Sequence, residues 1–246
     1  MSDPHKSVLL AYEVMGFCNP VAPATLDKVL AWARLKPGMR VLDIGCGNAA
    51  MARHLAQNYG VSVDAVERSP AVAEIARRRL EGVRGVTLHN LDSRALGPAA
   101  EPYDLVLSVG ASAVVAGPPE PQAVMEAVRP YAKPGGLVLW ADPFWKADPN
   151  PAFAAWIAPY AAYKSHTGNI EAGEKAGLKL IYAIASSDQE WDDCAFSMYA
   201  AAETWLADNP DHPEAADVRA RAEMQRGAYI NYSRDCMGFG LYLFRV

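Results

Sequence analysis

The 246-residue chain lacks the features that mark a membrane-spanning, disulfide-bonded or zinc-binding protein. Its longest apolar stretch, residues 105–117, is interrupted by serine and glycine and is too short to span a bilayer. The amino terminus lacks the apolar core of a signal peptide, so we expect a cytoplasmic protein. The cysteines Cys18, Cys46, Cys194 and Cys236 stand far apart without a C-x-x-C pair, which indicates free thiols and no metal site.

Clustered positive charge is scarce as well. The formal net charge is −5, and the longest basic run is Arg77-Arg78-Arg79, so nucleic acid and anionic membrane surfaces are disfavoured as partners. With 51% hydrophobic residues, a chain of this length can bury the core of one large domain, and we predict a single domain over residues 1–246. The composition fixes no oligomeric state.

The strongest pattern in the sequence is VLDIGCGNA at residues 41–49. An apolar strand signal leads into the turn Gly45-Cys46-Gly47, and helical spacing of apolar residues follows up to residue 59. Glycines let the backbone turn tightly and approach a ligand where a side chain would block it. Strand–turn–helix units of this kind bind nucleotides or cofactors at the carboxyl ends of strands in open α/β sheets.

Strands and helices alternate after this turn. Strand patterns cover residues 62–67, 85–90, 103–109 and 137–141, with helix patterns at 70–80 and 121–131. This alternation predicts a Rossmann-like α/β fold with a doubly wound, mostly parallel sheet.

The two ends of the chain follow a different rhythm. A flap is expected near the amino terminus, followed by a helix that Thr25 can cap. Near the other end, about fifty residues separate a sixth strand at 178–186 from a final apolar strand at 238–246, which is too long for a hairpin loop and predicts a helical insertion. We therefore divide the chain into a flap and helix (1–35), a cofactor-binding core (36–142) and a helical cap insertion (188–236).

Acidic residues close the first three predicted strands. Asp43 can order the glycine turn or hold the ammonium of an amino-acid-like ligand. Glu67, twenty residues after Gly47, is spaced to accept hydrogen bonds from both hydroxyls of a ribose. Asp92 can accept from an adenine amine beside Ser93, or cap a helix. The predicted cofactor site comprises Asp43, Gly45, Cys46, Gly47, Glu67, Arg68, Asp92, Ser93, Ser108 and Gly110. Ser69 is expected to cap the helix that follows.

Five motifs, at residues 41–49, 63–67, 90–93, 103–108 and 133–137, resemble in order and spacing those of class I S-adenosylmethionine-dependent methyltransferases. Ala49 departs from the pattern, since many members have a third glycine there. The resemblance implies a seven-stranded sheet with an antiparallel last strand, the glycine turn at the methionine moiety, Glu67 at the ribose, and Asp92 with Ser93 at the adenine. The flanks are similar to a bacterial branch of small-molecule or unassigned methyltransferases.

The resemblance implies methyl transfer from S-adenosylmethionine to a small-molecule acceptor. The sulfonium methyl is already activated, so in-line displacement needs alignment and exclusion of water, and it requires no metal. If the acceptor must lose a proton, candidate bases are His166, Asp142 and His5. Proximity without a dedicated base is an equally good hypothesis.

The acceptor pocket is expected from segments outside the shared core. Aromatic residues there favour a planar or cationic small molecule. Arg234 either binds a substrate carboxylate or forms a local salt bridge with Asp235. The candidates are Tyr12, Phe17, Asn19, Trp145, Tyr160, Trp191, Tyr229 and Arg234.

Two other functions remain open at this stage. Gly45-x-Gly47-x-x-Ala50 also satisfies a loose dinucleotide fingerprint, which would make the protein an NAD-dependent oxidoreductase. Asp43 and the Asp92-Ser93 pair argue against that alternative. A noncatalytic adenosyl-binding protein is the second alternative, because an intact cofactor motif does not prove turnover.

Overall fold

A single seven-stranded sheet organises the chain. The computed structural model describes residues 5–97, 101–111, 115 and 118–246. The strand order is β3-β2-β1-β4-β5-β7-β6. The strands are β1 Arg40–Ile44, β2 Ser62–Glu67, β3 Val86–Asn90, β4 Tyr103–Val109, β5 Ala132–Trp145, β6 Lys179–Ala185 and β7 Met237–Arg245.

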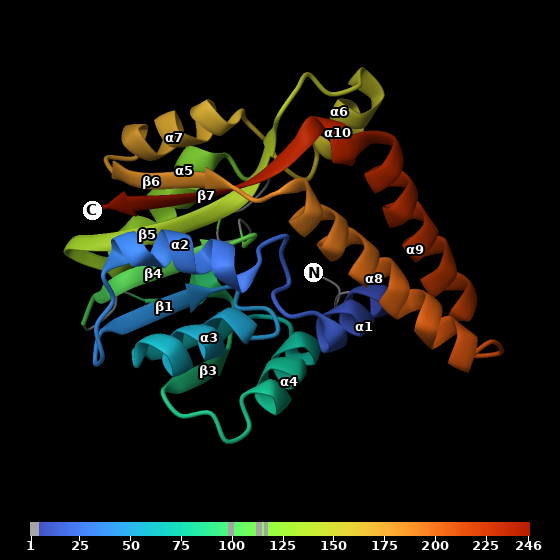
Figure 1. The fold of residues 1–246 in the computed structure, drawn as a ribbon, viewed down its shortest axis with the longest axis horizontal. Coiled ribbons are helices and arrows are strands. Elements are labelled where there is room, and N and C mark those ends of the chain that lie inside the picture. The colour runs from blue at the N-terminus through green and yellow to red at the C-terminus, as the bar shows by residue number, and fades with distance from the viewer. Residues whose placement is uncertain (1–4, 98–100, 112–114, 116–117) are drawn as a thin grey trace.

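The strand directions confirm the predicted sheet. β1 to β5 pair in parallel, whereas β7 lies antiparallel between β5 and β6 (Figure 1). The fold is therefore the Rossmann-like, seven-stranded α/β arrangement with an antiparallel last strand. Because the parallel strands all point the same way, the turns that follow β1, β2 and β4 meet at one edge of the sheet.

Helices cover both faces of the sheet. The helical elements are α1 Lys6–Val14, α2 Pro23–Ala33, α3 Ala50–Tyr59, α4 Pro70–Arg79, η1 Ser93–Ala95, α5 Pro121–Val128, η3 Arg129–Tyr131, α6 Pro151–Ile157, α7 His166–Lys175, α8 Asp188–Asp208, α9 Ala215–Ala228, η4 Tyr229–Ser233 and α10 Arg234–Cys236.

Two apolar clusters explain why both faces of the strands are hydrophobic. In β1, Val41 joins a cluster with α2 and α3, whereas Leu42 and Ile44 join one with α5 and α7. Alternate side chains of a strand point to opposite faces, so a sheet that is covered on both sides needs a continuous apolar run. The sequence of β1 supplies that run.

Helix starts show one confirmed prediction and one that was wrong. The Ser69 hydroxyl accepts from the Val72 N–H at 3.3 Å and caps α4, as predicted. Thr25 does not cap α2, which begins at Pro23. The Ala22 N–H instead donates to Glu190 of α8 at 2.7 Å, so a carboxylate distant in sequence satisfies this helix end.

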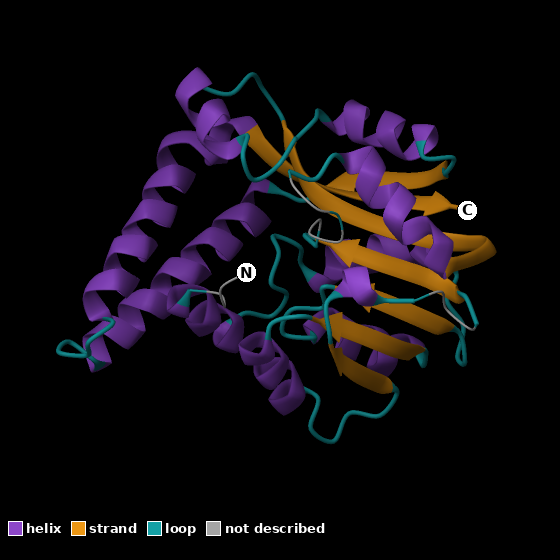
Figure 2. Cartoon of the chain, turned by 180° about the vertical axis from the view of Figure 1, so that it is seen from behind, coloured by secondary structure: helices purple, strands orange, loops and turns teal. Residues whose placement is uncertain are grey.

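The helical insertion stands away from the sheet. α8 and α9 form a hairpin beside the carboxyl ends of the parallel strands, and α1 packs along it (Figures 1 and 2). Its small core contains Ala202, Leu206, Val218 and Ala222, with Leu10 of α1 against it. Within the described residues, no helix is long and apolar enough to cross a membrane.

The stretch after β5 contains a helix that the sequence pattern did not predict. α6 is seven residues long, and Asn150 caps its start because its side chain accepts from the Ala152 N–H. Phe153 is its one buried side chain. A helix with a single buried position shows no apolar periodicity, which explains why the pattern was not visible.

Candidate functional site

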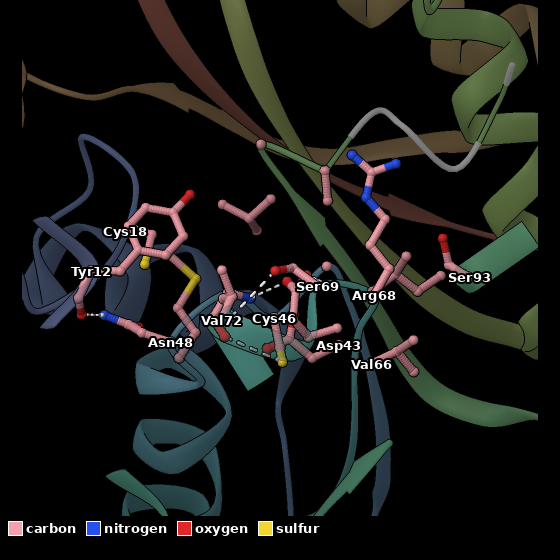
Figure 3. Close-up of a pocket in the computed structure, with 18 of the residues that line it drawn as sticks. Tyr12, Cys18, Asp43, Cys46, Asn48, Val66, Arg68, Ser69, Val72 and Ser93 are labelled. Carbon is pink, nitrogen blue, oxygen red and sulfur yellow. Dashed lines mark hydrogen bonds between the residues drawn. The ribbon is translucent and has the colours of Figure 1, made fainter. Parts of the chain in front are cut away.

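A cavity of about 620 Å³ lies where the turns after β1, β2 and β4 meet (Figure 3). Its floor is the sheet edge, and its other wall is the segment from α1 to residue 19, which we call the flap. Most of the predicted cofactor residues and three predicted acceptor residues line it: Asp43, Gly45, Cys46, Gly47, Glu67, Arg68, Asp92, Ser93, Gly110, Tyr12, Phe17 and Asn19.

The glycine turn has a backbone that only glycine adopts readily. Gly45 and Gly47 have φ of +71° and +54°. The turn is fixed because the N–H groups of Gly45 and Cys46 both donate to the Val66 carbonyl, at 2.9 and 3.0 Å. A Cβ on Gly45 would lie 2.5 Å from the Cβ of Ala111. Ala111 therefore packs directly against the turn, which leaves no space for a side chain at position 45.

Ala49 occupies the position where many family members have glycine. It has φ of +58° and is fully buried at the start of α3. A left-handed backbone costs a residue with a Cβ roughly 1–2 kcal/mol. The departure in sequence thus retains the glycine-like backbone at some cost in stability.

Asp43 is a buried carboxylate below the turn. It is 3% exposed, and its Oδ2 has no hydrogen-bond partner among the described residues. Burial, and then the charge of Glu67, raise its pKa to about 7. A buried carboxylate oxygen without a partner is costly, and a cation in the cavity would offset that cost. The site is therefore suited to a ligand with positive charge.

Glu67 ends β2 and faces the same cavity. Its Oε2 accepts from the Gly47 N–H at 3.2 Å, and its Oε1 accepts from the Ser69 N–H at 2.8 Å. Burial raises the pKa of Glu67, and these N–H groups oppose the shift. The Arg68 N–H is a third backbone donor to this carboxylate. A carboxylate has about four acceptor positions, so Glu67 retains capacity for a hydroxyl of a ligand.

Asp92 and Ser93 lie at the rim. The Asp92 carboxylate accepts from the Arg94 N–H at 2.9 Å and caps η1, the second of the two roles considered for it. It also accepts from the Arg94 guanidinium, which holds the pKa of Asp92 well below its usual range. Both residues line the cavity, so an adenine bound there could contact them.

The flap brings uncharged side chains over the glycine turn. The Asn19 amide donates to the Val109 carbonyl at 3.2 Å, and Gly110 makes room for it, since a Cβ there would lie 2.2 Å from Asn19 Oδ1. Burial raises the pKa of Tyr12 well above its usual value and that of Cys18 to about 12. Both groups therefore stay protonated at neutral pH, and Cys18 is not an activated thiolate.

Several predicted acceptor residues lie elsewhere. Trp145 packs edge-on against Phe153 and Tyr163. Tyr160 is 72% exposed. Trp191 and Tyr229 stack on each other at the base of the insertion. None of these four is among the described residues that line the cavity.

Arg234 forms a local ion-pair network, one of the two roles considered, although not with Asp235. Its guanidinium donates to Asp192 at 2.8 and 3.2 Å and lies 3.1 Å from Asp188. The partners come from α8, one turn apart. Arg234 thus joins η4 and α10 to α8 and, within the described part of the chain, stays outside the cavity lining.

The candidate bases and Ser108 are also away from the cavity. Nδ1 of His166 lies 3.0 Å from the Tyr242 hydroxyl, on the α7 side of the sheet. Asp142 lies opposite Gly240 in the β5–β7 ladder, and Ser108 is fully buried in β4. His5 pairs with Asp217 of α9 at 2.6 Å. The structure does not bring these side chains to the described lining.

Asn48 and Arg79 are structural partners of the site that the sequence patterns did not identify. Asn48 lines the cavity, and both side chains hydrogen-bond to the main chain of the flap. Asn48 lies inside the glycine motif and Arg79 inside a basic run, but neither motif predicts a partner 30 or more residues away.

Comparison with known proteins agrees with this geometry. Residues 41–136 match the methyltransferase domain family. The uncharacterized protein YjhP of Escherichia coli strain K12 is 29% identical over 225 residues, which cover 89% of this chain and 88% of that protein. A protein-L-isoaspartate O-methyltransferase of Thermococcus onnurineus is 31% identical over 66% of this chain and 68% of its own length.

A solved structure extends the agreement to the whole chain. The S-adenosylmethionine-dependent methyltransferase of Thiobacillus denitrificans, in complex with S-adenosylhomocysteine, superposes with a TM-score of 0.87. It is 26% identical, and the alignment covers 99% of both chains. The chain belongs to the class I S-adenosylmethionine-dependent methyltransferases. This methyltransferase uses S-adenosylmethionine as its methyl donor.

Proposed function

We propose that the methyltransferase binds S-adenosylmethionine in the cavity at the sheet edge and methylates a small molecule that enters beside the flap. In this proposal Gly45, Cys46 and Gly47 hold the amino-acid tail and Glu67 accepts from the ribose hydroxyls. Arg68, Asp92 and Ser93 flank the adenine, and Gly110 makes room for the Asn19 side chain at the acceptor side. A volume of about 620 Å³ is within the range of small-molecule pockets.

The observation that carries the proposal is the buried carboxylate of Asp43. Its Oδ2 has no hydrogen-bond partner among the described residues, and Asp43 lines the cavity below the glycine turn. An ammonium group placed there would stabilise the ionised form of Asp43, whereas a pyrophosphate would bring a like charge to it. This favours an amino-acid tail over a dinucleotide, and so disfavours the oxidoreductase alternative.

The flap supports a role in holding the acceptor. When bound, S-adenosylmethionine supplies a methyl group that is already activated for transfer. The protein must align the acceptor atom in line with that methyl group and exclude water, and Tyr12, Phe17 and Asn19 are placed to do so. The titratable flap residues that line the cavity, Tyr12 and Cys18, stay protonated. We therefore favour transfer by positioning, without a dedicated general base.

The first test is binding. Isothermal titration of the purified protein with S-adenosylmethionine, S-adenosylhomocysteine and NAD should give binding of both adenosyl ligands and none of NAD. Binding of NAD alone would refute the assignment of the cavity.

The second test is turnover. Small amines, phenols, carboxylic acids and thiols are screened with S-adenosylmethionine for release of S-adenosylhomocysteine. Product with one of these classes would identify the acceptor atom. Adenosyl binding with no product from any class would contradict the small-molecule acceptor.

A further inference from the structure

The carboxyl end of α1 is held by residues from outside the flap. A helix leaves its last four carbonyls without partners inside the helix, and basic residues often satisfy them. α1 has no basic residue in its last turn, and it ends at Met15 in an extended conformation. The Met15 N–H satisfies the Ala11 carbonyl, so the carbonyls of residues 12–14 need donors from elsewhere in the chain, and the carbonyls of Met15 and Gly16 lie just beyond them.

Arg79, the last residue of α4, supplies most of these donors. Its Nη1 donates to the carbonyls of Met15 and Gly16, both at 2.9 Å. Its Nη2 lies 3.3 Å from the carbonyl of Glu13 and 3.5 Å from that of Tyr12. One guanidinium thus spans the end of α1, and its positive charge opposes the negative end of the helix dipole.

Asn48 approaches the same carbonyls from the glycine turn. Its Nδ2 lies 3.0 Å from the carbonyls of Tyr12 and Gly16 and 3.1 Å from that of Met15 (Figure 3 shows the contact with Tyr12). Its Oδ1 accepts from the Ala50 N–H at 3.2 Å at the start of α3. The same side chain, which is almost fully buried, therefore links the start of α3 to the end of α1.

The main chain that these two residues hold carries the flap side chains into the cavity. A Cβ on Gly47 would lie 3.3 Å from Cys18 Sγ and 3.7 Å from the Tyr12 ring, so the flap packs closely on the glycine turn. We infer that Arg79 and Asn48 are positioning residues that fix the flap over the adenosyl cavity and thereby slow ligand release. The inference rests on the proposed function in so far as the cavity binds an adenosyl ligand.

The ion pairs of α1 are weaker anchors. Its amino-terminal end pairs with α9 through His5–Asp217 and Lys6–Glu214, and Glu13 pairs with Arg78. These acidic partners are exposed, and exposed ion pairs contribute little to stability. Arg78 and Arg79 are adjacent arginines that both contact the flap. Arg78 pairs with the exposed side chain of Glu13, whereas Arg79 donates to main-chain carbonyls.

The decisive experiment compares Arg79→Met with Arg78→Met as the matched control. Hydrogen exchange without ligand should show the amides of residues 9–19 exchanging at least tenfold faster in Arg79→Met and within twofold of the wild type in Arg78→Met. Stopped-flow measurements with S-adenosylhomocysteine should show dissociation at least tenfold faster in Arg79→Met, with the association rate within threefold. A loss of overall stability alone would not produce this split between the two rates.

Asn48→Asp is a second variant that keeps the Oδ acceptor for Ala50 but replaces the donor to the flap by an anion. It should also raise flap exchange and ligand dissociation, and it carries the test if circular dichroism shows that Arg79→Met does not fold. Equal behaviour of the Arg79 and Arg78 variants would overturn the inference, as would faster flap exchange with unchanged ligand dissociation. A wild type that binds no S-adenosylhomocysteine would refute the proposed function, whereas the exchange measurement without ligand tests the flap anchor separately.

Discussion

The two walls of the cavity are built in different ways. The sheet wall uses short motifs at strand ends. Its hydrogen bonds connect the turn after β1 to the end of the neighbouring β2, such as Gly47 to Glu67 and Gly45 to Val66. The flap wall is held by residues far away in sequence, including Arg79 and Asn48. Features of the adenosyl side are therefore encoded locally, whereas the acceptor side depends on how distant elements pack.

The largest effect on ligand affinity is expected from adding a side chain to the glycine turn of the sheet wall. Gly45→Ala places a Cβ 2.5 Å from Ala111 at a φ of +71°, so the turn must shift. We expect the Kd for S-adenosylhomocysteine to rise ~100-fold, or about 2.8 kcal/mol, measured by isothermal titration. Gly16→Ala is the control, because a Cβ there meets nothing within 4 Å. Unchanged affinity in Gly45→Ala would remove the turn from the binding site.

Asp43→Asn tests the charge below the turn. Loss of the carboxylate should weaken binding of S-adenosylmethionine by ~10- to 30-fold at pH 8, or about 1.4–2 kcal/mol, which is the lower part of the range for a hydrogen bond to a charged group. For wild type, affinity should fall as the pH drops below about 7, where Asp43 takes up a proton. An affinity that is independent of pH in both proteins would contradict a cation at Asp43.

Asp43→Asn should weaken ligand binding but stabilise the folded protein without ligand. The folded-state pKa of Asp43 is raised to about 7, so the folded protein retains a proton that the unfolded chain releases above about pH 4. Through this residue, the free energy of unfolding therefore falls as the pH rises from about 4 to 7, by at most about 1.4 kcal/mol per pH unit. Asp43→Asn should be more stable than wild type at pH 8 and similar at pH 4, in urea titrations without ligand.

Glu67→Ala tests the end of β2. We expect the Kd for S-adenosylmethionine to rise at least tenfold, about 1.4 kcal/mol, because the hydroxyl acceptor and the contacts to Gly47 and Ser69 are lost. Glu74→Ala, which removes an exposed glutamate of α4, is the control. Equal affinities in the two variants would place the ribose elsewhere.

The smallest effect is expected outside the cavity. Tyr160 is 72% exposed and lies after α6, so Tyr160→Ala should leave S-adenosylhomocysteine affinity and the unfolding midpoint within error of wild type. The corresponding change on the flap wall, Tyr12→Ala, should alter binding. A larger effect at Tyr160 than at Tyr12 would reverse the assignment of the acceptor side.

Prediction from sequence succeeded where the signal is local. The strands at 62–67 and 103–109 have the expected bounds, and Ser69 caps α4, because hydrophobic pattern and capping chemistry act within a few residues. The glycine turn and Glu67 were brought together as predicted, since the register of parallel β1 and β2 fixes their separation. Because strands and helices alternate along the chain, the ends of the parallel strands meet at one edge of the sheet and bring these residues together.

It was incomplete where the side chain has a choice of distant partners. For Arg234 the sequence left a substrate contact and a local salt bridge open, and the structure shows ion pairs with α8. Trp191 and Tyr229, candidates for the acceptor pocket, stack on each other at the base of the insertion. Thr25 was expected to start α2, yet Glu190 satisfies that helix end. An aromatic or arginine residue has similar local preferences in either role, so the packing of whole elements decides between them.

The sequence by itself determined the sheet, the glycine turn and the acidic residues at its edge, because these follow from periodicity and from the backbone freedom of glycine. Only the tertiary structure decided that Asp43 has a buried oxygen without a described partner and that Arg79 and Asn48 hold the end of α1. Burial and long-range hydrogen bonds depend on which elements become neighbours, and no window along the chain contains that information.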